Sequence, residues 1–139
     1  MFLDNQLFAY GTLMFSEVWL YLIGRECPRM EAKLLNHSAF IVNGYTFPGL
    51  RETKYNHYVK GILYSGITKK DWDILDAFED NFYERVPVKV HSEKNITHLA
   101  YTYIVKPENY GELSDDLWDV DWFKKNMLGQ YMDRICGFL

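Results

Sequence analysis

Apolar positions along the chain alternate between the spacing of two that is typical of strands and the spacing of three to four that is typical of helices. Residues 7–10 form a short apolar run that stops at Gly11, and Ser16 precedes apolar residues at helical spacing in residues 18–23. Ser16 has the chemistry of an N-cap, and Gly24 stands where a helix stop is expected. The segment predicts a strand, a tight turn and a helix.

The middle of the chain has strand patterns. Residues 30–47 mix polar residues with β-branched and aromatic ones, which predicts strands that Pro48-Gly49 brings to an end. Residues 57–65 alternate and predict a further strand. Gly61 inside it indicates a bulge or the close approach of another backbone segment.

Two helices and a hairpin are predicted in the second half. Thr68 and Asp71 form a capping box with Asp in place of Glu, opening a helix that ends near Glu79. Residues 82–90 and 97–105 predict a hairpin. Ser114 can cap a final helix, whose first turn would carry Asp115, Asp116 and Asp119.

These elements predict a strand-rich α+β domain with three helices. The 139 residues fit one domain, and no linker or repeat divides them. We therefore expect a single domain over residues 1–139, with 114–139 as a C-terminal helical segment.

Charge and composition restrict the function classes. The net charge of −4 argues against a nucleic-acid partner, which would require clustered basic residues. The N-terminal residues do not resemble a signal peptide, and no uncharged run reaches the length of a membrane span, so we expect no membrane association. Cys27 and Cys136 lack CxxC spacing and predict buried or free thiols in the cytoplasm. The sequence leaves the oligomeric state open.

No motif for a metal, a cofactor or a covalent nucleophile is present. The histidines stand apart, without the spacing of a zinc site, and there is no GxSxG, Walker A or GxGxxG pattern. We expect chemistry without a metal or cofactor.

The turn Tyr10-Gly11-Thr12-Leu13 is one candidate binding element. Where a strand gives way to a turn before a helix, consecutive backbone N–H groups can point at a ligand oxygen, and Gly11 would let that ligand approach. The alternative is an ordinary turn in which Gly11 supplies an unusual dihedral angle. The tripeptide Tyr10-Gly11-Thr12 by itself favours the ordinary turn.

Glu79 is the candidate proton-transfer residue because of its helical phase. Trp72, Leu75 and Glu79 fall at i, i+3 and i+7, which places Glu79 on the apolar stripe of its helix. Loss of solvation there would raise its pKa toward the range useful for general acid-base catalysis. Alternatively, Glu79 pairs with Arg85, or the helix ends at Phe78 and Glu79 turns outward. The opposite, solvated face carries Lys69, Asp73, Asp76 and Asp80.

Arg85 has two possible roles. Its guanidinium could bind a substrate carboxylate in a bidentate manner, or it could anchor a carboxylate of the protein such as Glu79 or Asp76. We favour the structural role.

Several motifs, in this order, resemble the γ-glutamyl cyclotransferase-like, or AIG2-like, family. The segment 75–85, Leu-Asp-Ala-Phe-Glu-Asp-Asn-Phe-Tyr-Glu-Arg, is similar to the family pattern L-D-x-F-E followed by Y-x-R and is the most specific of them. The others are Phe8-Ala9-Tyr10-Gly11-Thr12-Leu13, Phe47-Pro48-Gly49-Leu50, Val59-Lys60-Gly61-Ile62-Leu63-Tyr64 and Ala100-Tyr101-Thr102-Tyr103-Ile104.

The resemblance implies a small mixed β-barrel flanked by helices, with a cavity between the N-terminal turn and the glutamate. By this resemblance Tyr10, Gly11, Thr12 and Leu13 would bind the glutamyl part of a substrate, Glu79 would accept and donate the proton, and Tyr83 and Tyr103 would form pocket walls. Asp80 stands where the family commonly has Gly, so we expect an altered turn after Glu79. The segment from Ser114 has no motif that matches.

The resemblance implies a γ-glutamyl cyclotransferase that acts on a small-molecule γ-glutamyl amine or γ-glutamyl amino acid. The free α-amine of the substrate would attack its own γ-carbonyl, releasing 5-oxoproline and an amine. The alternatives are a non-catalytic small-molecule-binding or interaction domain that keeps the same cavity, and a purely structural or regulatory protein. The identity of the leaving amine is open.

Overall fold

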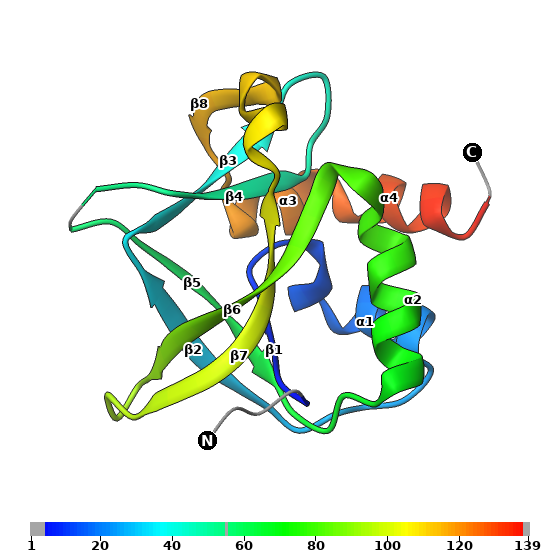
Figure 1. The fold of residues 1–139 in the computed structure, drawn as a ribbon. Coiled ribbons are helices and arrows are strands. Elements are labelled where there is room, and N and C mark those ends of the chain that lie inside the picture. Colours follow the sequence, from blue (N-terminus) through cyan, green and yellow to red (C-terminus); the bar gives the residue numbers. More distant parts are fainter. Residues whose placement is uncertain (1–4, 55, 138–139) are drawn as a thin grey trace.

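The structure, a computed structural model, describes residues 5–54 and 56–137 and has a five-stranded β-barrel at its centre (Figure 1). The barrel order is β1-β5-β2-β6-β7, closed by a parallel pairing of Leu7 in β1 with Tyr101 in β7. All other strand pairs of the barrel are antiparallel. The strands of the barrel are β1 (Leu7–Ala9), β2 (Arg29–Leu35), β5 (Tyr58–Tyr64), β6 (Tyr83–Ser92) and β7 (Thr97–Val105).

A second, three-stranded sheet covers one end of the barrel, and helices lie along the side of the barrel (Figure 1). The sheet has the order β4-β3-β8, with β3 at His37–Val42, β4 at Pro48–Glu52 and β8 at Leu113–Leu117. The helices are α1 (Ser16–Ile23), α2 (Lys69–Glu79), α3 (Val120–Asn126) and α4 (Leu128–Ile135), with 3-10 turns at Thr12–Met14, Asp80–Phe82 and Pro107–Glu112.

The helices pack against the barrel through large apolar side chains that are buried from solvent. Trp19 of α1 stacks on Tyr64 of β5 with ring centroids 3.8 Å apart. Leu75 of α2 and Phe123 of α3 are fully buried. Full burial of such a side chain contributes about 2 kcal/mol relative to exposure, so this packing fixes the helices against the barrel.

Most of the predicted elements are confirmed. The α+β class and the barrel flanked by helices are present, as are the strand-turn-helix at the N-terminus, the helix over residues 69–79 and the β6-β7 hairpin. Gly24 ends α1 in the left-handed conformation with a φ of 80°. The register of β5 against β2 runs without interruption through Gly61, so this glycine marks a close approach and not a bulge.

Three predictions are wrong. Phe15, not Ser16, is the N-cap residue of α1, and no side chain caps this helix. Pro48-Gly49 does not end the preceding strands but begins β4, because both residues pair with β3. The segment from Ser114 is not one helix: Leu113–Leu117 forms β8, and two short helices follow, the first capped by Asp119.

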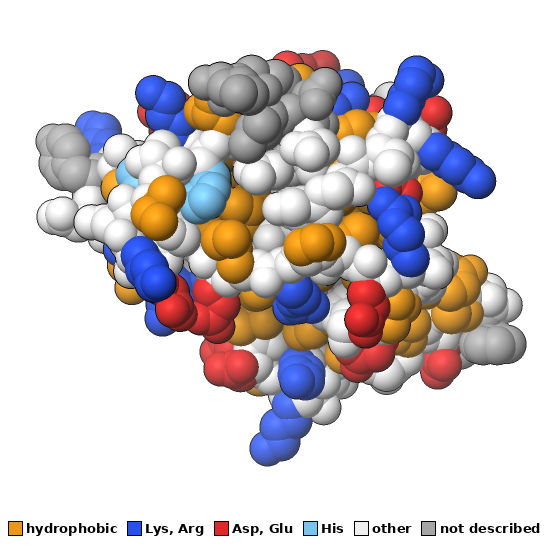
Figure 2. Space-filling model, turned by 90° about the horizontal axis from the view of Figure 1, so that it is seen from below, with side chains coloured by type: hydrophobic (Ala, Val, Ile, Leu, Met, Phe, Trp, Pro, Cys, Tyr) orange, Lys and Arg blue, Asp and Glu red, His pale blue; other side chains and the backbone are white. Residues whose placement is uncertain are grey.

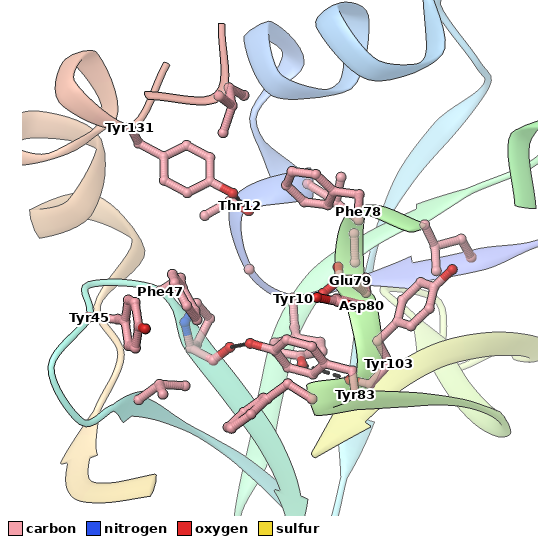
Figure 3. A pocket seen from close by; sticks show the side chains of 18 of the residues that line it. Tyr10, Thr12, Tyr45, Phe47, Phe78, Glu79, Asp80, Tyr83, Tyr103 and Tyr131 are labelled. Atoms are coloured by element: carbon pink, nitrogen blue, oxygen red, sulfur yellow. Dashed lines mark hydrogen bonds between the residues drawn. The ribbon is translucent and has the colours of Figure 1, made fainter. Parts of the chain in front are cut away.

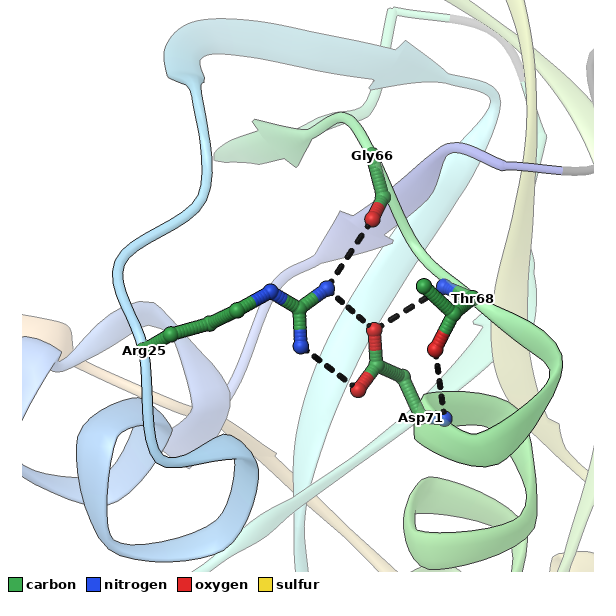
Figure 4. A network of polar contacts seen from close by, with 4 residues as sticks. All are labelled: Arg25, Gly66, Thr68 and Asp71. Carbon is green, nitrogen blue, oxygen red and sulfur yellow. Dashed lines mark hydrogen bonds and ion pairs between the residues drawn. The ribbon is translucent and has the colours of Figure 1, made fainter.

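The predicted capping box of α2 is present and extends into an ion pair (Figure 4). Thr68 Oγ1 accepts from Asp71 N at 3.2 Å, and Asp71 Oδ2 accepts from Thr68 N at 2.9 Å. Arg25 donates to both carboxylate oxygens of Asp71, at 2.8 and 2.5 Å, and to the Gly66 carbonyl oxygen at 3.0 Å. These hydrogen bonds hold the pKa of Asp71 down at about 2. The loop after α1 is thereby fixed to the start of α2.

Three further observations concern the predictions made from the sequence about membranes, nucleic acid and cysteines. Within residues 5–54 and 56–137, no helix has both the length and the apolar character needed to cross a membrane. Basic and acidic side chains are interspersed on the face shown in Figure 2. Cys27 and Cys136 are free thiols and Cys27 is buried, as predicted.

Candidate active site

A cavity of about 430 Å³ lies where β1, the end of α2 and α4 meet (Figure 3). All the predicted site residues except Arg85 line it. The full lining consists of Leu7, Phe8, Ala9, Tyr10, Gly11, Thr12, Leu13, Val42, Tyr45, Phe47, Pro48, Phe78, Glu79, Asp80, Phe82, Tyr83, Tyr103, Tyr131, Arg134 and Ile135. The structure therefore brings the turn and the carboxylate together, although Leu13 and Glu79 are 66 positions apart in the sequence.

The turn after β1 presents backbone groups to this cavity. Met14 N donates to Gly11 O at 2.9 Å and Phe15 N donates to Thr12 O at 3.2 Å, which makes residues 12–14 a single 3-10 turn. The first N–H groups of such a turn have no acceptor within it. The N–H groups of Thr12 and Leu13 are thus the ones that a bound oxygen can meet.

Gly11 has a packing reason to be glycine. Its φ of −122° is negative and does not by itself require glycine. A Cβ at this position would, however, lie only 2.9 Å from Pro48 Cγ. A side chain here would push β4 away from the turn.

Four tyrosines of the lining are fixed by hydrogen bonds from their hydroxyl groups (Figure 3). Tyr10 donates to the Tyr103 carbonyl oxygen at 2.6 Å, and Tyr83 donates to the Pro48 carbonyl oxygen at 2.7 Å. The Tyr131 hydroxyl lies 3.0 Å from Thr12 Oγ1, and the Tyr103 hydroxyl donates to Asp76 Oδ1 at 2.7 Å. The walls are therefore rigid rings held in defined orientations.

Glu79 is the carboxylate of this cavity with the most perturbed acidity. Glu79 is only partly exposed, and its side chain makes no hydrogen bond or ion pair with any other described residue. Burial, and then the negative charge of Asp76 one turn earlier, raise the pKa of Glu79 to about 8. The alternatives of a Glu79–Arg85 pair and of an outward-turned side chain do not describe this structure.

The tyrosines report the same environment. Burial raises the pKa of Tyr131 to about 12 and those of Tyr10, Tyr83 and Tyr103 well above their usual value, and the charge of Glu79 adds to each of these increases. All four hydroxyls therefore stay protonated at neutral pH. Glu79 faces neutral rings that supply no countercharge.

Arg85 lies outside the cavity lining and holds Asp76. Its Nε donates to Asp76 Oδ1 at 3.0 Å, and its guanidinium sits 4.4 Å from the Trp72 ring and 4.7 Å from the Tyr101 ring. This is the geometry of the structural role that we favoured from the sequence. A neighbouring depression is lined by Asp76, Ala77, Asp80, Asn81, Tyr83, Arg85, Tyr101 and Tyr103.

Asp80 forms the turn after Glu79 in an unusual backbone conformation. Its backbone has a φ of 61° and a ψ of −163°, a conformation that is nearly restricted to glycine. The residue adopts the glycine-like turn and accepts the strain. Such a conformation costs on the order of 1–3 kcal/mol in a residue with a side chain.

We predict that Asp80→Gly raises the stability by about 1 kcal/mol, since relief of strain exceeds the extra entropy of glycine in the unfolded chain. The free energy of unfolding from urea denaturation measures this. Asp80→Ala is the matched control, because it removes the carboxylate but keeps the strain and should give no comparable gain. Equal stabilisation by both variants would instead assign the effect to the charge.

Sequence reasoning missed the part of the cavity that comes from α4 and from the β3-β4 turn. Tyr131, Arg134 and Ile135 line it from α4, and Tyr45 and Phe47 line it from the turn. The spacing of i, i+3 and i+4 was the available signal in α4. This spacing predicts a shared face of the helix, but it does not show that the face lies against the turn after β1.

No group of three or more His, Cys, Asp or Glu side chains in the described residues is arranged to hold a metal ion. The polar groups of the cavity are backbone N–H groups, hydroxyls and carboxylates with one guanidinium. Such a set can bind a polar small molecule and transfer a proton.

Comparison with known proteins identifies relatives of this chain. The sequence model for the family described as gamma-glutamyl cyclotransferase, AIG2-like matches residues 7–123. AIG2-like protein D of Arabidopsis thaliana is 30% identical over 127 residues, which cover 87% of this chain and 80% of the relative.

Solved structures share the fold at low sequence identity. A solution structure of a protein from Arabidopsis thaliana superposes with a TM-score of 0.73 at 19% identity, covering 95% of this chain and 79% of the other. A structure named gamma-glutamyl cyclotransferase superposes with a TM-score of 0.63 at 15% identity, covering 96% and 86%.

Proposed function

Because the chain belongs to the gamma-glutamyl cyclotransferase, AIG2-like family, we propose that it converts γ-glutamyl amides to 5-oxoproline and a free amine. The observation that carries this proposal is that Glu79, which is partly buried and has no ion pair with any other described residue, lies in one cavity with the turn of residues 10–13. The substrate is a γ-glutamyl amine or a γ-glutamyl amino acid, and the catalysis is general acid-base.

The reaction transfers two protons from the substrate's α-nitrogen to the leaving nitrogen. Glu79 takes the first proton from the α-ammonium group, and the neutral amine attacks the γ-carbonyl carbon to form the C–N bond of a five-membered ring. Glu79 then protonates the leaving nitrogen as the old C–N bond breaks. It also carries one of the two protons still on the ring nitrogen to the leaving amine, so that the lactam nitrogen keeps a single N–H and the amine leaves as an ammonium. The carboxylate ends in its starting state.

The raised pKa of Glu79 suits both halves of this shuttle. The pKa of Glu79, raised to about 8, approaches that of an α-amino group, which is about 8 in a peptide and higher beside a free α-carboxylate. Proton transfer between groups of similar pKa costs little, and a catalytic pKa close to the working pH serves both acid and base steps. A carboxyl with an ordinary pKa would be too weak a base for the α-ammonium.

The turn of residues 10–13 supplies the complementary electrostatics. The N–H groups of Thr12 and Leu13 would donate to a substrate oxygen, either the developing oxyanion or the α-carboxylate. One preorganised donor at an oxyanion is typically worth about 3 kcal/mol in a water-poor site. The rings of Tyr10, Tyr83 and Tyr103 exclude water around the reacting atoms.

The test is a panel of γ-glutamyl compounds incubated with the purified protein, with 5-oxoproline measured by mass spectrometry. We expect release of 5-oxoproline from at least one compound without added metal or cofactor. If no compound reacted while the same compounds or 5-oxoproline raised the melting temperature, the protein would be a non-catalytic binder instead.

A pH prediction follows from the two causes of the Glu79 shift. The pKa is raised to about 8, so the carboxylate form appears only as the pH rises, and kcat/KM should increase up to about pH 8. Asp76→Asn removes a negative charge that raises this pKa, and it leaves Arg85 unpaired nearby, so the acid limb should move to lower pH. The pH profile of kcat/KM measures the shift.

Asp73→Asn is the control for this prediction. Asp73 lies on the exposed face of the same helix, where its carboxylate is 3.7 Å from Lys69 Nζ. It should leave the profile unchanged, because the charge that raises the pKa of Glu79 is that of Asp76 and not that of Asp73, which pairs with Lys69 instead. An acid limb that stayed in place in Asp76→Asn would show that Asp76 does not act on the titrating group.

A further inference from the structure

Helix α4 forms a wall of the cavity and is tied to the catalytic turn. Tyr131, Arg134 and Ile135 lie on one face of the helix and all line the cavity. Figure 3 shows Tyr131 reaching from α4 toward Thr12, whose Oγ1 is 3.0 Å from the tyrosine hydroxyl. The Tyr131 ring also packs edge-on against Phe123, with centroids 5.6 Å apart. The position of α4 relative to the turn is therefore fixed.

The chemistry of ring closure decides which part of a substrate lies near each wall. The attacking α-amine and the γ-carbonyl both belong to the glutamyl group, so this group must lie at Glu79. The leaving part then points toward the open side of the cavity. Arg134 lines the cavity and is exposed to solvent, which is what is expected of a residue at the mouth of the cavity, on the side of the leaving part.

The cavity lining carries negative charge at the end of α2 and positive charge on α4. Glu79 and Asp80 contribute carboxylates at the end of α2, and Arg134 is the only cation among the described residues that line the cavity. The Arg134 side chain has no hydrogen bond or ion pair within residues 5–54 and 56–137. A guanidinium binds a carboxylate in a bidentate manner and repels an ammonium.

We propose that Arg134 is a specificity-determining residue that selects leaving amines carrying a carboxylate, so that the substrates are γ-glutamyl amino acids or peptides and not γ-glutamyl polyamines. This inference rests on the proposed function. A carboxylate on the leaving part is remote from the reacting atoms and is bound equally in the ground state and the transition state. Its loss therefore raises KM and leaves kcat nearly unchanged.

The experiment compares three substrates that differ only in the charge of the leaving part: γ-glutamyl-alanine, γ-glutamyl-alaninamide and γ-glutamyl-1,4-diaminobutane. For the unmodified protein we expect kcat/KM to be about five- to tenfold higher for the alanine compound than for its amide, as befits a partly exposed ion pair. Arg134→Gln should abolish this ratio through KM, with the amide unaffected. Arg134→Glu should favour the diaminobutane compound.

Lys124→Gln is the matched control, because Lys124 is an exposed cation of α3 outside the lining, and it should change none of the ratios. The inference is overturned if Arg134→Gln lowers kcat/KM equally for the acid and the amide, since Arg134 would then hold the substrate's own α-carboxylate. It is also overturned if neither value changes.

The two proposals fail in different ways. Absence of 5-oxoproline both from these three compounds and from the wider panel of γ-glutamyl compounds contradicts the proposed function. The melting-temperature shifts produced by the same three compounds still measure the preference of Arg134 in that case, and equal shifts by the acid and the amide contradict the inference.

Discussion

Glu79→Gln is expected to lower kcat by a factor of about 10³ while the fold is retained, since loss of a general acid-base group typically costs 10²- to 10⁴-fold. Glutamine has nearly the shape of glutamate but cannot accept or deliver a proton. Substrate binding through the turn of residues 10–13 is kept, so KM should change little. Single-turnover rates of 5-oxoproline formation measure the loss.

The stability of the same variant provides a second readout with a definite sign. An unfolded glutamate has a pKa of about 4.3, whereas that of Glu79 in the fold is about 8. Between these values the folded protein holds a proton that the unfolded chain has lost, so this group's contribution to stability is full below about pH 4 and is lost as the pH rises to 8. A glutamine side chain does not titrate and has no such dependence. The melting temperature of Glu79→Gln minus that of the unmodified protein should therefore increase from pH 5 to pH 8.

Glu84→Gln is the control for both readouts. Glu84 is an exposed residue of β6 outside the cavity lining, so its rate and its pH dependence of melting should match those of the unmodified protein. A Glu79→Gln variant with full activity would place the proton shuttle elsewhere. A difference in melting temperature that did not grow with pH would show that the carboxyl is well solvated.

Local chemistry made Glu79 and its helix predictable from the sequence. The period of 3.6 residues placed Glu79 on the same stripe as Trp72 and Leu75, and the structure has those two side chains buried. The capping box of Thr68 and Asp71 depends only on residues three apart, and it is present as predicted. Signals of this kind are complete within one turn of helix, so no knowledge of the rest of the fold is needed.

The errors arose where distant pairing overrides local preference. Ser114 resembles a helix cap, but its Oγ donates to the Ile41 carbonyl oxygen at 2.6 Å, and Leu117 pairs with Phe40 in β3. The wall formed by α4 depends on a hydrogen bond between residues 119 positions apart. A single sequence does not show such pairings, and the resemblance in motifs ended before this segment. The role of Arg134 could therefore be inferred only from the structure.

The largest expected effect on stability comes from Gly61→Ala, which should lower the free energy of unfolding by about 3 kcal/mol, equivalent to a fall of roughly 10 °C in melting temperature. A Cβ at this position in β5 would lie 2.4 Å from the Ala9 carbonyl oxygen and 2.7 Å from Phe8 Cζ. The first of these atoms belongs to the backbone of β1 and cannot turn aside as a flexible side chain does. To make room, β1 must separate from β5.

This displacement should also affect catalysis, because β1 leads directly into the turn of residues 10–13. Activity measured well below the melting temperature should fall together with stability. Gly129→Ala is the control, since a Cβ there meets no atom within 4 Å and alanine is favoured over glycine in an exposed helix such as α4. It should raise stability slightly and leave activity unchanged. If Gly61→Ala instead melted within 2 °C or so of the unmodified protein, overpacking of this size being expected to cost about 1–3 kcal/mol, the contact between β1 and β5 would have to be looser than described. The rigid placement of the turn opposite Glu79 would then need another cause.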